Sequence, residues 1–273
     1  MFSRKIRKLS AALLVLCISV SLCAAAYAKG VYSDYIDSVM DTFEEANKAS
    51  DYASQQQVNG AYRMVQLLEV VANEVDKDGN SADYIDDIMD AFSDNDELCE
   101  SAAQQLVNGL YRSVELLELI CYEVDEYGEF DDYVASVIDA FNKNDAASTG
   151  ASQQAANGAY QCVKLMQVIA FSLDEDEIYS AVIQDIMDIF LYNDSSCTSA
   201  NQQLVNGVYR MEQLLEIIDY ECDTQAVYDD YVSDITSRFA SDDKKCSSAV
   251  QQSVNGLYKS VELLELIARS LDK

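Results

Sequence analysis

The chain has 273 residues, of which 48 are acidic, 18 are basic and none is histidine, so its net charge is −30. A surface this acidic repels phosphates and anionic lipid headgroups, which excludes most nucleic-acid roles and favours basic partners or cations. Because 49% of the residues are hydrophobic, the charge does not indicate disorder, and we expect a packed core.

Residues 1–28 have the pattern of a signal peptide. A basic stretch precedes an apolar run at 9–25, and the sequence A-Y-A at 26–28 fits a cleavage site. A retained membrane anchor is the alternative, but serines interrupt the apolar run and small residues end it. Cleavage removes four basic residues and no acidic ones, which leaves 14 basic against 48 acidic residues and a net charge of −34. We therefore expect an exported protein, secreted, periplasmic or at the cell surface, without membrane insertion after cleavage.

The dipeptide Asn-Gly marks an internal repeat. It recurs every 49 residues without insertion, at Asn59, Asn108, Asn157, Asn206 and Asn255. Removing 28 of 273 residues leaves 245, which is five times 49, so the repeat and the cleavage site support each other. The predicted units are 29–77, 78–126, 127–175, 176–224 and 225–273, with no separate domain after the signal peptide.

Each unit has the pattern of two helices. In the second unit one apolar stripe of helical period consists of Tyr84, Ile85, Ile88, Met89 and Phe92. A polar connector follows, and a second helix of about 25 residues ends near Asp125, with apolar residues at steps of three and four. Because one such hairpin cannot bury its apolar face alone, the sequence predicts an all-α fold, an α-solenoid of five 49-residue hairpins.

The long helix carries a polar set that we call the ladder: a glutamine, an asparagine and a tyrosine on one face. Its members are Gln55, Asn59, Tyr62, Gln104, Asn108, Tyr111, Gln153, Asn157, Tyr160, Gln202, Asn206, Tyr209, Gln251, Asn255 and Tyr258. In a structural interpretation, these side chains satisfy one another between repeats. In a functional interpretation, they line a concave surface and bind an extended peptide, a protein segment or a glycan.

Two further features of the long helix bear on these interpretations. Glycine inside a helix costs about 1 kcal/mol against alanine, so the glycine after each asparagine predicts close approach of another backbone. The third repeat has Gln161 and Gln167 where the other repeats mostly have a basic residue and glutamate. The central repeat therefore has neutral side chains at two positions that are mostly charged in the other repeats.

The acidic junctions between repeats favour a rival hypothesis, calcium binding, because calcium prefers carboxylate oxygens. Asp76, Asp78 and Asn80 resemble the start of an EF-hand loop. The likeness fails where Gly79 comes two places too early and Asp87, not glutamate, holds the twelfth position. A structural envelope or self-assembling protein is the third hypothesis, and the oligomeric state stays open.

Cysteine and histidine usage limits the chemistry. Six cysteines follow the signal peptide, and Cys197 and Cys246 lie at equivalent places in adjacent connectors, so we predict a disulfide between them. Without histidine or a CxxC motif, neither a zinc site nor a haem site is indicated, and calcium is the only cofactor considered. With no histidine base and no glycine-rich phosphate loop, we predict a binding or scaffold protein and not an enzyme.

Overall fold

The structure, a computed structural model, describes residues 30–272. The predicted signal peptide lies outside these residues. Within the described range the chain forms ten α-helices and no strand, which confirms the predicted all-helical class. None of these helices is long and apolar enough to span a bilayer.

Short and long helices alternate, and helices of one kind begin 49 residues apart. The short helices are α2 (Ser33–Ala49), α4 (Ala82–Leu98), α6 (Asp131–Ala147), α8 (Ser180–Asp194) and α10 (Asp229–Asp243). The long helices are α3 (Ala53–Val75), α5 (Ala102–Val124), α7 (Ala151–Leu173), α9 (Ala200–Cys222) and α11 (Ala249–Leu271). Each predicted unit therefore contains one helix of each kind.

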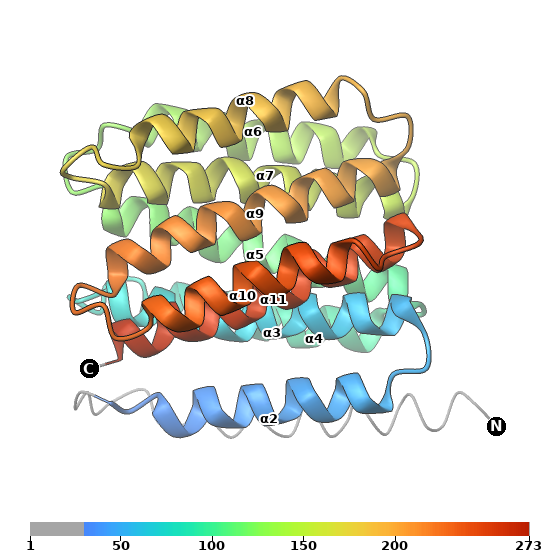
Figure 1. The fold of residues 1–273 in the computed structure, drawn as a ribbon, viewed down its shortest axis with the longest axis horizontal. Coiled ribbons are helices and arrows are strands. Elements are labelled where there is room, and N and C mark those ends of the chain that lie inside the picture. The colour runs from blue at the N-terminus through green and yellow to red at the C-terminus, as the bar shows by residue number, and fades with distance from the viewer. Residues whose placement is uncertain (1–29, 273) are drawn as a thin grey trace.

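The five long helices form a closed ring. Each long helix packs against the next one, and α11 packs against α3, so the first and last repeats lie side by side (Figure 1). The seam has the same geometry as the other joints: a Cβ on Gly60 would lie 2.9 Å from Cβ of Leu257, and one on Gly109 would lie 2.9 Å from Cβ of Ala61. The predicted close approach of another backbone is confirmed at Gly109, where the backbone carbon of Ala61 would lie 3.3 Å from the added Cβ. The hairpin array curves enough to meet its own start.

Hydrogen bonds at the seam also match those at an internal joint. Asp272 accepts the backbone N–H of Tyr32 at 3.2 Å and the hydroxyl of Ser33 at 2.9 Å. Asp174 likewise accepts the hydroxyl of Ser180 at 2.8 Å. Because the last repeat holds the first as one internal repeat holds the next, the ring has no exposed end among the described helices.

The short helices lie outside the ring and cover its joints. Each presents a phenylalanine that meets the tyrosine of the preceding long helix edge to face, with ring centroids 4.6 to 4.8 Å apart. The pairs are Phe43 with Tyr258, Phe92 with Tyr62, Phe141 with Tyr111, Phe190 with Tyr160 and Phe239 with Tyr209. The long helices are buried on most sides, so the core is continuous around the ring.

Candidate functional site

The repeated asparagines lie inside the hairpins. All five are buried, with 6 to 8% of each residue exposed, and each donates its side-chain N–H to a carbonyl of the short helix in its own unit, at 2.9 to 3.1 Å. The pairs are Asn59 with Phe43, Asn108 with Phe92, Asn157 with Phe141, Asn206 with Phe190 and Asn255 with Phe239. The asparagines are therefore not displayed on a concave surface, because each buried amide is used to fasten two helices together.

The ladder tyrosines tie neighbouring units together. Their hydroxyls donate to a side chain near the end of the next short helix. The pairs are Tyr62 with Asp96, Tyr111 with Asp145, Tyr160 with Asp194, Tyr209 with Asp243 and, across the seam, Tyr258 with Asn47. Burial raises the pKa of Tyr160, and its bond to Asp194 raises that pKa further. The hydroxyl thus stays protonated and remains a donor.

The ladder glutamines cap their own helices in four of the five repeats. Their side-chain oxygens accept a backbone N–H four residues earlier, at 2.8 to 2.9 Å. The pairs are Gln104 with Glu100, Gln153 with Thr149, Gln202 with Thr198 and Gln251 with Ser247. Gln55 has no such bond in the described structure. The regular ladder therefore holds the ring together, although the Oδ1 atoms of Asn59, Asn108 and Asn206 have no hydrogen-bond partner.

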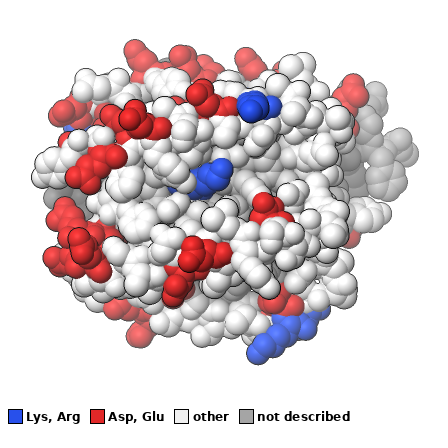
Figure 2. All heavy atoms as spheres, turned by 90° about the horizontal axis from the view of Figure 1, so that it is seen from above, with Lys and Arg blue, Asp and Glu red and all other residues white. Residues whose placement is uncertain are grey.

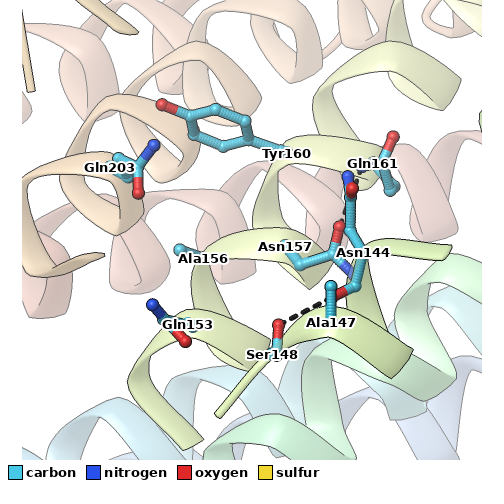
Figure 3. Close-up of a pocket in the computed structure, with 9 residues that line it drawn as sticks. All are labelled: Asn144, Ala147, Ser148, Gln153, Ala156, Asn157, Tyr160, Gln161 and Gln203. Atoms are coloured by element: carbon cyan, nitrogen blue, oxygen red, sulfur yellow. Dashed lines mark hydrogen bonds between the residues drawn. The ribbon is translucent and has the colours of Figure 1, made fainter. Parts of the chain in front are cut away.

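A pocket of about 270 Å³ opens in the third repeat (Figure 3). It is lined by Asn144, Ala147, Ser148, Gln153, Ala156, Asn157, Tyr160, Gln161 and Gln203. These residues come from the end of α6, the start of α7 and one turn of α9. Figure 3 shows the amides of Gln153 and Gln203 on one side of Ala156 and those of Asn144 and Gln161 on the other. The pocket is thus surrounded by side-chain amides.

Two residues distinguish this pocket from the same place in the other repeats. Ala156 replaces a valine, which is Val58, Val107, Val205 or Val254 elsewhere, and Gln161 replaces a basic residue, which is Arg63, Arg112, Arg210 or Lys259. In the fifth repeat, Lys259 Nζ lies 3.9 Å from Asp242, the residue equivalent to Asn144, so a basic side chain extends across the matching space. The third repeat lacks both the valine methyl groups and this basic side chain.

The buried polar atoms show what the pocket needs from a ligand. In the second repeat, the acceptor Asn108 Oδ1 and the donor Arg112 Nε both lack a hydrogen-bond partner. They lie one helical turn apart, so one bridging water can satisfy both. In the third repeat, Gln161 Nε2 donates to Asn157 Oδ1 at 3.1 Å. Gln161 Oε1 is then left as a lone buried acceptor on a residue that is 2% exposed. A ligand that donates an N–H or O–H would satisfy it.

The pocket is neutral although the molecule is acidic. None of its nine lining residues is charged. The adjacent carboxylates of Asp145 and Asp194 accept hydrogen bonds from Gln154 and Gln203 at 2.9 and 3.1 Å. These carboxylates repel anions, so the pocket favours a ligand that is neutral or cationic.

The first acidic junction caps a helix. Asp76 accepts the backbone N–H of Asn80 at 3.0 Å and that of Ser81 at 2.9 Å, so both of its carboxylate oxygens are occupied, while Asp78 is exposed. Among residues 30–272, no three histidine, cysteine, aspartate or glutamate side chains are placed to hold a metal ion. Calcium binding at Asp76, Asp78 and Asn80 thus stays a prediction without an assembled site.

The predicted disulfide is not formed. The six cysteines in the described part of the chain are all free, and Cys197 and Cys246 are not at bonding distance. The physical reason is that connectors of neighbouring units are held apart by helix packing, at distances of about 8 to 10 Å. Cys121 and Cys162 are buried in the ring, and burial raises the pKa of both thiols.

Two buried carboxylates in the fourth repeat escaped the sequence-based prediction. Glu212 is 2% exposed and stands where the other repeats have valine; Asp219 is fully buried and stands where they have alanine or cysteine. Glu212 Oε1 and both oxygens of Asp219 have no hydrogen-bond partner. Burial raises the pKa of Glu212 to about 8 and that of Asp219 to about 7. Comparing the repeats position by position would have found both residues.

The pocket and the buried acids are therefore two places inside the ring where the chain departs from its own repeat. No protein-family model, curated protein or solved structure matches the chain, so no relative supplies a role for either place. The pocket is the stronger candidate for a binding site, because it is open to a ligand and has a buried acceptor without a donor.

Proposed function

We propose that this protein is a binding module that takes a neutral glycan into the amide-lined pocket of its third repeat. The observation that supports this proposal is the buried Gln161 Oε1, which has no donor, at a pocket where the valine and the basic residue of the other repeats are replaced. A sugar hydroxyl both donates and accepts, so it can satisfy this oxygen and also bond the neighbouring amides. The exported location expected from residues 1–28 agrees with a ligand outside the cell.

An extended peptide is less well supported. Recognition along an extended backbone needs a row of free amides, but the asparagines of all five repeats and the ladder glutamines of four are engaged in internal bonds. A pocket of about 270 Å³ instead suits one sugar unit or one polar side chain. A sugar of about 12 heavy atoms at about −0.3 kcal/mol per atom would bind in the millimolar range.

The test is a titration with neutral monosaccharides, followed by the side-chain amide signals of Gln161 and Gln153 in a nitrogen–proton correlation spectrum. Short capped peptides that contain glutamine or asparagine form the competing panel. Saturable shifts with a sugar, and none with the peptides, are expected. Saturable shifts with the peptides alone would replace the glycan by a peptide segment, and no shifts with either panel would overturn the proposal.

Matched variants locate the binding site. Ala156→Val with Gln161→Arg gives the third repeat the second repeat's residues at these two positions and should abolish the shifts. The reverse change, Val107→Ala with Arg112→Gln, gives the second repeat the third repeat's residues at these two positions and should add a second site. Unchanged binding by the first variant would show that the ligand sits elsewhere. A thermal melt of each variant checks that the ring still forms.

A further inference from the structure

The helix α8 exposes more large apolar side chains than any other short helix in the described part of the chain. Val182, Ile189, Leu191 and Tyr192 are 48, 45, 60 and 74% exposed. At the position of Ile189, the other repeats have Thr42, Ala91, Ala140 and Arg238. At the position of Leu191 they have Glu44, Ser93, Asn142 and Ala240. At the position of Tyr192 they have Glu45, Asp94, Lys143 and Ser241. The fourth repeat alone places three large apolar side chains at these exposed positions.

These exposed residues do not help to build the ring. The core side of α8 consists of Ile183, Ile186, Met187 and Phe190, which are all buried. Val182, Ile189 and Tyr192 follow one another at steps of seven and three, so they form a stripe along one flank of the core side, while Leu191 lies on the other flank of the helix. The stripe spans eleven residues, which are ten steps of about 1.5 Å and so about 15 Å, and two to three turns of another helix would cover it. Its surface is available to a partner.

The charge around the stripe limits what that partner can be. Asp185 and Asp188 are exposed on the same side of α8, and α8 has no basic residue. Figure 2 looks onto the side of the molecule where α6 and α8 lie, and shows acidic side chains with only a few basic ones between them. A second copy would bring its own Asp185 and Asp188 against these carboxylates, and anionic lipid would be repelled. A basic partner has the complementary charge.

We propose that the outer face of α8 binds an amphipathic helix of a partner protein, with leucine-like residues on one side and lysine or arginine on the flanks. The apolar side covers Val182, Ile189 and Tyr192, and the basic flanks meet Asp185 and Asp188. This mode of recognition uses apolar anchors at helical spacing for affinity and flanking charges for orientation. The surface is separate from the pocket, so this inference does not depend on the glycan proposal.

The test uses a fluorescein-labelled model peptide of about 18 leucine and lysine residues in an amphipathic helical pattern. Its binding is followed by fluorescence anisotropy at 0.15 M salt, where long-range charge effects are screened within about 8 Å. The variant Ile189→Ala, Leu191→Ser, Tyr192→Asp copies the outer face of α4 and leaves the buried side of α8 intact. Tyr231→Asp, at an exposed site on α10, is the matched control.

The triple variant should bind the peptide at least roughly tenfold more weakly, and the control should bind like the wild type. Both variants gain one negative charge, so general attraction of a cationic peptide would strengthen in both. Equal or tighter binding by the triple variant would therefore overturn the proposal. A wild-type dimer in sedimentation that the triple variant loses would also overturn it, because the occupant would then be a second copy.

Discussion

Replacing Asp219 with alanine should stabilise the ring at neutral pH. Asp219 is fully buried, and neither of its oxygens has a hydrogen-bond partner. Burial, together with the smaller effects of the Asp223 and Asp229 charges, raises its pKa to about 7. Alanine occupies the equivalent position in three other repeats, at Ala72, Ala170 and Ala268, so the change fits the packing already present.

The sign and size of the effect follow from linkage. Below about pH 4, Asp219 is protonated in both the folded and the unfolded state. Between about pH 4 and pH 7, the folded protein keeps a proton that the unfolded chain has lost, so stability falls by about 1.4 kcal/mol per pH unit. The loss is complete above the folded pKa and reaches about 4 kcal/mol. Between pH 5 and pH 8 we therefore expect about 3 kcal/mol of this loss, which alanine would remove.

The assay is urea unfolding of the wild type and of Asp219→Ala at several pH values from 5 to 8. Asp87→Ala, at an exposed position of α4, controls for the change in net charge. The stability gain of Asp219→Ala should grow as the pH rises and level off above about pH 7. A pH-independent gain would refute the titration of Asp219. A loss of stability at every pH would show that the carboxyl makes a favourable contact, and would refute the reasoning altogether.

Two further substitutions and one labelling experiment test the packing of the ring. Asn108→Ala should cost about 1 to 3 kcal/mol in denaturant unfolding, because the carbonyl that its amide bonds is left buried and unpaired; a cost below about 0.5 kcal/mol would place the amide in solvent. Gly109→Ala should cost about 1 to 3 kcal/mol, since the added Cβ would lie 2.9 Å from Cβ of Ala61 and 3.3 Å from its backbone carbon; an unchanged melt would contradict that close approach. In pulsed alkylation followed by mass spectrometry, Cys121 and Cys162 should be labelled last, because both are buried with a raised pKa; early labelling would show that the ring opens readily.

Periodicity predicted the helices well because burial on one side imposes it directly. Four of the five residues in the predicted stripe of the second unit, Ile85, Ile88, Met89 and Phe92, are buried, and only Tyr84 is half exposed. The long helix, predicted at about 25 residues, has 23. The prediction of close approach at the helical glycines succeeded because a glycine that destabilises its helix is kept where a larger residue would clash. At Gly109 an added Cβ would lie 2.9 Å from Cβ of Ala61.

Neither the closure of the ring nor the burial of the ladder asparagines was predictable from the same pattern. Closure depends on a small rotation between successive repeats, which hydrophobic period does not encode. An asparagine that bonds two helices together and one that binds a ligand have the same sequence pattern. Asn108, which donates to the carbonyl of Phe92, is of the first kind. The disulfide prediction failed because repeat equivalence places Cys197 and Cys246 in neighbouring connectors without specifying the distance between them.

Ring closure changes how the departures from the repeat are interpreted. In an open array the end repeats differ from the rest, because they must cover the core with a polar face. Here the first and last repeats pack on each other, and Gly60 meets Leu257 as Gly109 meets Ala61. Marked departures fall instead at the third repeat, with Gln161, and at the fourth, with the buried acids and the exposed apolar residues of α8. Because neither position is an end of the array, capping does not explain them, and binding is the role that their exposed surface and unpaired acceptor support.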